Sequence, residues 1–170
     1  MELKIMGAVL VVAGCGGFGF LLAANHRREE RALRQLLSAL DYMSCELQYH
    51  LTPLPELCRQ ASREASGCIG RVLAALSLEL EDQISPEVSS CMRSALAKTK
   101  DIPGTAEGCL RLLGSSLGRF DLDGQIKGLE SVRAACRREL EALSRNRDER
   151  LRSYQTLSLC AGAALAILFL

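Results

Sequence analysis

The hydrophobic pattern in the middle of the chain has the period of α-helices. From Leu33 onward, apolar residues recur three and four positions apart over more than two heptads, which indicates a helix with a narrow packing seam. Similar seams follow along the chain. The predicted seam residues are Leu33, Leu36, Leu40, Met43, Leu47 and Leu51; then Ile69, Val72, Leu73, Leu76 and Leu80; then Val88, Met92 and Leu96; then Leu110, Leu113 and Leu117; and last Leu129, Val132, Cys136, Leu140 and Leu143.

Proline and glycine divide this pattern into helices. Thr52 before Pro53 predicts an N-cap and a first-turn proline, and Pro55 still falls in the first turn, where a missing N–H costs little. Gly67 should end that second helix, and Ser85 precedes the fourth in the same way. The remaining boundaries are a break at 101–104, a turn at 120–124, and a last helix of about thirty residues that starts at Asp123.

Both ends of the chain lack charged residues for long enough to cross a bilayer. Residues 5–24 form one such run, and 153–170 form a second, shorter one that spans if its first polar residues lie at the interface. We therefore expect a transmembrane span in 1–24, a helical bundle in 25–152 and a second span in 153–170. In this arrangement the lipid bilayer is a partner of the protein.

The charges beside these runs predict the orientation. Arg27, Arg28 and Arg31 follow the first run, and further arginines precede the second, so the positive-inside rule places the central domain in the cytoplasm. An alternative interpretation is a lipoprotein signal ending at Cys15. The chain stays apolar through Ala24, which argues against that signal and against a cleaved secretory peptide.

Composition argues against several classes of function. The net charge is +1, from 21 basic and 20 acidic residues, so there is no basic excess for nucleic acid. Aromatic residues make up 4%, which makes a large pocket for a small-molecule substrate improbable. The 8 cysteines include no C-x-x-C pair and mostly occupy apolar helix positions. This favours reduced structural thiols over disulfides, metal ligands or redox work, and no cofactor is expected.

The candidate catalytic patterns are weak. The glycine-rich run 14–19 lies inside the first apolar segment and not after a strand. Asp121 resembles the first residue of a calcium loop, but the required glycine is misplaced, so a helix N-cap is the better interpretation. Glu46 and His50, four apart, are more typical of a surface contact than of an acid–base couple. We therefore expect no enzyme.

Two segments carry a more specific signal. Gly114 and Gly118, four apart, would let another helix approach closely, although Gly118 is equally well explained as a helix C-cap. The segment 46–56 resembles the E-x-x-Y-x-x-T-P-L-P-E motif of the stage III sporulation protein AB family, and 113–125 resembles that family's L-G-x-x-L-G-x-x-D-x-x-x-Q motif. The matching residues are Glu46, Tyr49, Thr52, Pro53, Leu54, Pro55 and Glu56 in the first motif, and Gly114, Leu117, Gly118, Asp121 and Gln125 in the second.

The resemblance covers essentially the whole chain, and the family looks like a reduced relative of the F-type platform protein of type II secretion and type IV pilus systems. It implies an all-α fold: an F-domain-like antiparallel bundle of about six helices carried on two terminal transmembrane helices. It also implies a non-enzymatic platform in the mother cell–forespore secretion-like complex, on the mother-cell side of the outer forespore membrane. The implied partners are a cytoplasmic secretion-type ATPase and other membrane components of the stage III complex; oligomerisation stays open.

Two alternatives to the platform remain. The first is a membrane-anchored helical adaptor or regulatory protein that binds another soluble partner, and the second, weaker one is thiol redox work. The motif residues themselves have a structural explanation as two helix–helix corners, and direct contact with a partner is the competing one.

Overall fold

The structure is a computed structural model. It describes the backbone of residues 2–82, 87–118 and 122–169, and the side chains of 25–82, 87–118 and 122–145. Within the described residues the chain is all-helical, as predicted, with six helices and no strand. The helices are α1 (Glu2–Tyr49), α2 (Leu54–Glu64), α3 (Gly67–Glu81), α4 (Val88–Lys98), α5 (Gly104–Ser116) and α6 (Leu122–Phe169).

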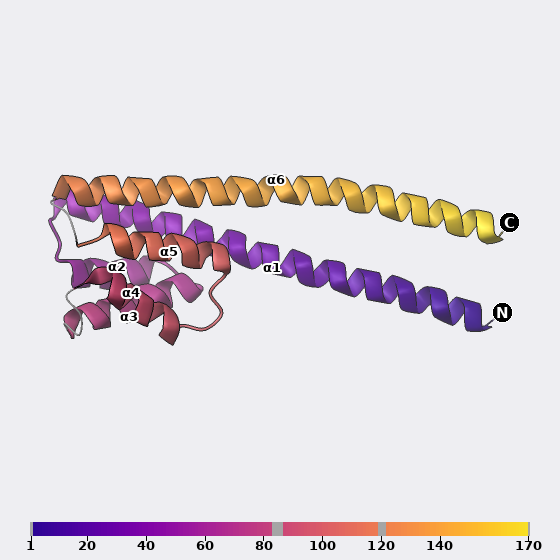
Figure 1. The fold of residues 1–170 in the computed structure, drawn as a ribbon, viewed down its shortest axis with the longest axis horizontal. Coiled ribbons are helices and arrows are strands. Elements are labelled where there is room, and N and C mark those ends of the chain that lie inside the picture. The colour runs from indigo at the N-terminus through magenta and orange to yellow at the C-terminus, as the bar shows by residue number, and fades with distance from the viewer. Residues whose placement is uncertain (1, 83–86, 119–121, 170) are drawn as a thin grey trace.

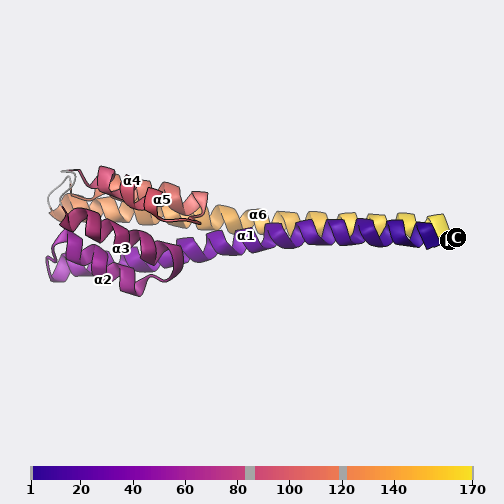
Figure 2. The same ribbon diagram turned by 90° about the horizontal axis from the view of Figure 1, so that it is seen from below.

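The first and last helices form a long antiparallel pair. Each has 48 residues; they lie together in the head and draw apart toward the two chain ends, which lie at the same end of the molecule (Figure 1). The four short helices pack against this pair at the opposite end (Figure 2). We call α2–α5, together with the parts of α1 and α6 that they cover, the head. The predicted bundle is thus a head at one end of a two-helix stalk.

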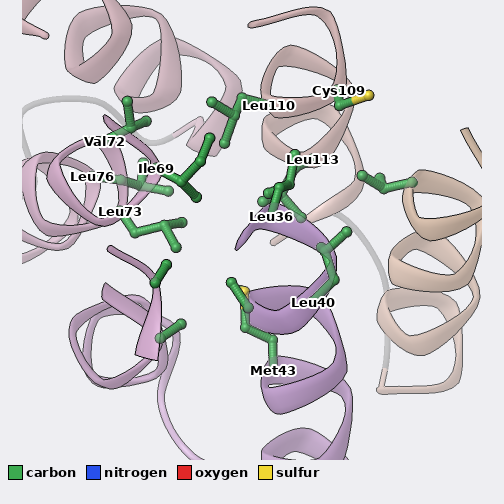
Figure 3. Close-up of a cluster of buried hydrophobic side chains, with 14 of the residues drawn as sticks. Leu36, Leu40, Met43, Ile69, Val72, Leu73, Leu76, Cys109, Leu110 and Leu113 are labelled. Carbon is green, nitrogen blue, oxygen red and sulfur yellow. The ribbon is translucent and has the colours of Figure 1, made fainter. Parts of the chain in front are cut away.

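The core of the head confirms most of the predicted seams. Leu36, Leu40 and Met43 of α1 are fully buried, and Figure 3 shows them meeting side chains of α3 and α5. Burying one such side chain stabilises the fold by about 1.5–3 kcal/mol. The seam of α6 weakens along the helix, because Leu129, Val132 and Cys136 are buried whereas Leu140 and Leu143 are only partly so. The head therefore ends at about this level of α6.

Polar side chains join the helices at the edges of this core. Glu79 of α3 is 5% exposed, and its carboxylate pairs with the ammonium group of Lys98 on α4. Arg133 of α6 holds Asp41 of α1, with Nε 2.9 Å from Oδ1. These contacts fix the short helices to each other and the long helices to each other.

Three local predictions were wrong. Leu51 does not continue the seam of α1: the helix ends at Tyr49, and Leu51 has a φ of 52° and is 66% exposed. Thr52 does not cap α2, because Pro53 takes the N-cap position and the Thr52 hydroxyl bonds elsewhere. Leu122 already belongs to α6, which therefore starts one residue before the predicted Asp123 and includes the last three residues of the predicted turn. The caps predicted at Ser85 and Asp121 lie outside the described residues.

The predicted spans fall where side chains are not described. Among the described residues, no helix is long and apolar enough to cross a membrane. Residues 1–24 and 153–170 lie outside the side chains that the structure describes. In the backbone, α1 and α6 continue without a break from the head through both of these segments.

Candidate functional site at the corner where the two motifs meet

The first motif forms the corner between α1 and α2. Pro53 excludes helical backbone at the residue before it, so α1 cannot continue past this point. Leu51 takes the left-handed conformation that turns the chain, at a cost of about 1–2 kcal/mol for a residue with a Cβ. Pro55 then lies in the first turn of α2, where its missing N–H is not needed. The prolines predicted to fix a helix corner therefore do so.

A chain of polar side chains stabilises this corner. Thr52 Oγ1 donates a hydrogen bond to Glu46 Oε2 over 3.0 Å. One turn earlier in α1, Tyr42 Oη donates to Gln60 Oε1, and within α2 Gln60 Nε2 donates to Glu56 Oε1, both over 2.8 Å. The bond between Tyr42 and Gln60 thus holds α2 against α1, and the motif residue Glu56 fixes the Gln60 side chain. Tyr42 and Gln60, which complete the connection, stand outside the motif and were missed by the sequence analysis.

The ionisation of these groups suits structure better than catalysis. The hydrogen bond from Gln60, aided by Arg59, keeps the pKa of Glu56 below its ordinary value. Loss of hydration, together with the neighbouring Glu46, raises the pKa of the Tyr42 phenol. Near neutral pH, Glu56 is therefore held as a carboxylate and Tyr42 as a neutral phenol. His50 Nδ1 lies 3.5 Å from Glu46 Oε2 on an exposed surface, in agreement with the predicted surface contact.

The second motif brings α5 against α4. A Cβ added to Gly114 would lie 2.6 Å from Met92 Cβ, so the two backbones are too close for any side chain there. Gly118 fulfils both predicted roles: its φ is +75° just after α5 ends, and an added Cβ would meet Val88 Cγ2 at 2.5 Å. Leu117 between them is fully buried. Gln125 lies half-buried in α6, and Asp121 is outside the described residues.

The two motifs meet at the end of the head farthest from the chain ends. Leu54 of the first motif has its Cδ2 3.8 Å from the position of a Cβ on Gly118 of the second. Figure 1 shows that the α1–α2 corner and the start of α6 occupy this same end. The motif residues with described side chains therefore contribute to one region.

Gln48 near the end of α1 and Ile126 near the start of α6 line one hollow between the two helices. The end of α1 and the start of α6 are therefore neighbours at this end of the head.

Large apolar side chains are exposed at this same end. Tyr49 is 76% exposed, Leu51 is 66% exposed and Leu122 at the start of α6 is 38% exposed. We call these three residues the distal patch. Tyr49 was predicted as a corner residue, but its exposure leaves it little part in packing. The sequence analysis missed Leu51 and Leu122 as surface residues, because the first continues a buried seam in the pattern and the second was placed in a turn.

The cysteines match the prediction of structural thiols where they are described. Those at 45, 58, 68, 91, 109 and 136 are all free, and most of them are buried. Burial raises the pKa of Cys58 to about 12, which makes it a poor nucleophile. A hydrogen bond between Cys109 and Cys136 lowers the pKa of the first thiol and raises that of the second. Among the described residues, no group of His, Cys, Asp and Glu is placed to hold a metal ion.

Comparison with known proteins gives the family. The model of the family described as stage III sporulation protein AB matches residues 4–170. A curated relative, stage III sporulation protein AB of Bacillus subtilis (strain 168), is 28% identical over 131 residues, which cover 75% of this chain and 76% of the relative. A solved structure of a stage III sporulation protein AB has a TM-score of 0.62 at 21% identity and covers 72% of this chain and 98% of its own. Both relatives are named for sporulation and not for a catalytic activity. The chain belongs to the stage III sporulation protein AB family.

Proposed function

We propose that this protein is a non-enzymatic membrane platform of the mother cell–forespore secretion-like complex, and that it docks a cytoplasmic secretion-type ATPase. The observation that carries the proposal is the convergence of both family motifs, with the exposed distal patch, at the end of the head remote from the chain ends. A partner in the cytoplasm would reach this end without obstruction by the membrane.

The anchoring part of the proposal is supported by the uncharged runs and the backbone. Residues 1–24 and 153–170 are the proposed spans, with 25–152 as the cytoplasmic domain. The part of α1 before residue 25 is about 36 Å long at 1.5 Å per residue, enough for a hydrocarbon core of about 30 Å. Because both chain ends lie at one end of the molecule, one bilayer would take both segments (Figure 2).

The docking part is supported by the chemistry of the distal patch. An exposed tyrosine is typical of the centre of a protein interface, Leu51 and Leu122 add apolar area at the same end of the head, and Gln48 and Asp123 provide polar neighbours. The rest of the two motifs holds this surface in place: Thr52 and Glu46 fix the corner, and Gly118 lets the neighbouring helices close beneath it. Structural residues and contact residues are thus combined in one region.

Co-purification tests the docking. Full-length protein is co-expressed with the ATPase, and the two are purified together in detergent. Tyr49→Ser and Leu122→Ser should each reduce the ATPase recovered by about tenfold, as is usual for a central interface residue. Leu112→Ser on α5 is the matched control, because Leu112 and Leu122 are both 38% exposed.

Two outcomes would count against the proposal. If Leu112→Ser reduces recovery as much as Leu122→Ser, the distal patch is not the docking surface. If the wild-type proteins never associate, even when co-expressed in membranes, the platform proposal is wrong and the adaptor hypothesis replaces it.

A further inference from the structure

A hollow bordered by arginines lies at the end of the head that faces the chain ends. Its volume is about 300 Å³. It is formed where α1, the start of α3 and the connection before α5 come together, and Figure 1 shows that connection at this end of the head. We call it the basal hollow. Its charged lining residues are Arg28, Arg31, Arg71 and Asp101.

The cations of the basal hollow are only weakly neutralised within the protein. Among the described lining residues, Asp101 is the acidic one, and its Oδ1 is 3.9 Å from Arg28 Nη2. Both of these side chains are more than half exposed, so this pair is weak. Arg71 Nη2 donates to the carbonyl oxygen of Lys100 over 3.5 Å. Each guanidinium has five N–H donors, so most of them remain available to an anion.

The backbone adds donors on the same side. Gly67 and Cys68, the first residues of α3, line the basal hollow. Their N–H groups belong to the first turn of a helix, which carries partial positive charge and has no acceptors within the helix. Ser66 at the N-cap makes no capping bond, because its hydroxyl accepts a hydrogen bond from Gln35 Nε2 over 2.6 Å. The helix end and the arginines therefore favour the same kind of ligand.

We propose that the basal hollow binds the phosphate of an anionic phospholipid headgroup. This inference rests on the membrane anchoring proposed above, because that anchoring sets the depth of the hollow. Arg28 and Arg31 follow the end of the first uncharged run by about 6 and 10 Å along α1. The headgroup layer is about 5–8 Å thick on each side of the hydrocarbon core. The long arginine side chains reach this layer, whereas a soluble phosphate would have no reason to gather there.

Arg71 distinguishes an anion-binding site formed by the fold from the basic residues that merely adjoin the first uncharged run. Arg28 and Arg31 would face the bilayer whatever their purpose, because they adjoin the first run and also set the orientation. Arg71 belongs to α3 and is not one of those residues, yet the fold brings it to the same hollow. Lipid binding therefore depends on Arg71 if the basal hollow is a specific site, and does not depend on it if only the basic residues beside the first uncharged run attract lipid.

Lipid binding by the full-length protein in neutral detergent is the test. Native mass spectrometry would measure binding of phosphatidylglycerol, with phosphatidylcholine and inorganic phosphate as the other ligands. Wild type should bind phosphatidylglycerol best, and Arg71→Gln should weaken that binding about fivefold, as expected for one cation near a lipid surface. Arg71→Lys should retain most of it. The matched control is Arg93→Gln, which removes an arginine that is also exposed, from α4.

Each other result overturns the inference. Equal binding by Arg71→Gln and Arg93→Gln would mean that only the general surface charge attracts lipid. Binding of inorganic phosphate as strong as that of phosphatidylglycerol would mean a site for free anions and not for headgroups. Alkaline extraction of membranes containing the wild-type protein tests the anchoring by itself. A protein that resists extraction but binds phosphatidylglycerol no better than phosphatidylcholine is anchored and lacks this site.

Discussion

Two glycines of α5 differ in what surrounds them. A Cβ on Gly114 would lie 2.6 Å from Met92 Cβ, whereas a Cβ on Gly108 would meet nothing within 4 Å. Gly114→Ala should therefore destabilise the fold by about 1–3 kcal/mol through overpacking. Gly108→Ala should stabilise it by about 0.5–1 kcal/mol, because alanine favours the helix. Urea unfolding of the full-length protein in detergent, followed by circular dichroism, measures both.

The matched pair makes the result decisive. Both changes add one methyl group to the same helix, so helix propensity affects them equally. If Gly114→Ala is as stable as Gly108→Ala, α4 and α5 are not in the close contact described.

The thiols differ in a second testable way. Cys45 is exposed, and Cys58 is buried with its pKa raised to about 12. Maleimide at pH 7 should therefore label Cys45 quickly and Cys58 at least about a hundredfold more slowly. Peptide mapping by mass spectrometry gives the rate at each cysteine. Labelling of Cys58 in the folded protein at the rate of Cys45 would contradict this packing.

Single residues were predictable where the pattern is steric and local. The spacing of Gly114 and Gly118 predicted a close approach, and the structure places Met92 and Val88 there. The exposure of Tyr49 was not predictable, because a tyrosine beside a helix corner can either pack into the corner or lie on the surface. Only the path of the chain around Tyr49 decides between these two positions.

At the scale of elements, the pair Glu79–Lys98 couples α3 to α4. The hydrogen bond from Lys98 is the main reason that the pKa of Glu79 is below its ordinary value, and burial opposes it. In wild type, this pair stabilises the fold above the unfolded pKa of Glu79, and the stabilisation is lost as the pH falls through the folded pKa. In Lys98→Met, burial outweighs the remaining hydrogen bond from Ser94, so the folded pKa of Glu79 rises above its ordinary value.

The contribution of Glu79 should therefore change sign between the two proteins. Acidification from pH 7 to about 4.5 should destabilise wild type through this group and stabilise Lys98→Met relative to its own value at pH 7. Thermal unfolding across this range measures the difference, and Lys98→Arg should behave like wild type. The same pH profile for Lys98→Met and wild type would show that Lys98 does not set the pKa of Glu79.

The elements followed from the sequence except where two local signals competed. The seam of α1 repeats through Leu51, but Pro53 stops the helix earlier and turns Leu51 outward. Thr52 has the chemistry of an N-cap, but the carboxylate of Glu46 lies within its reach and accepts the hydrogen bond that its hydroxyl donates. In both cases a neighbour across the corner outweighed the preference read from adjacent residues.

At the scale of the whole molecule, the proposed orientation predicts where a probe can reach. Arg59 lies exposed on α2 in the head. In a cysteine-free background, Arg59→Cys should not react with an impermeant maleimide in intact cells and should react once the membrane is opened. Reaction in intact cells would place the head on the outer side and reverse the orientation.

The basal hollow could not have been predicted from the sequence. Arg28 and Arg71 come together because α2 runs back along α1, so that α3 begins beside residue 28. The connection before α5 forms the third wall of the basal hollow. No spacing within one helix records that arrangement. The sequence identified the arginines beside the first uncharged run, and only the packing of α3 adds Arg71 to them.

Because α1 is one unbroken helix, a tilt at one of its ends displaces the other end. Its 48 residues span about 72 Å, so a tilt of about 5° at the distal end moves the opposite end by about 6 Å. That is close to one turn of a helix. Because α6 runs antiparallel beside it with the same length, a rocking of the head would slide the two helices past each other in opposite directions. A modest push at the head thus becomes, at the far end, a sideways displacement as large as one turn of a helix.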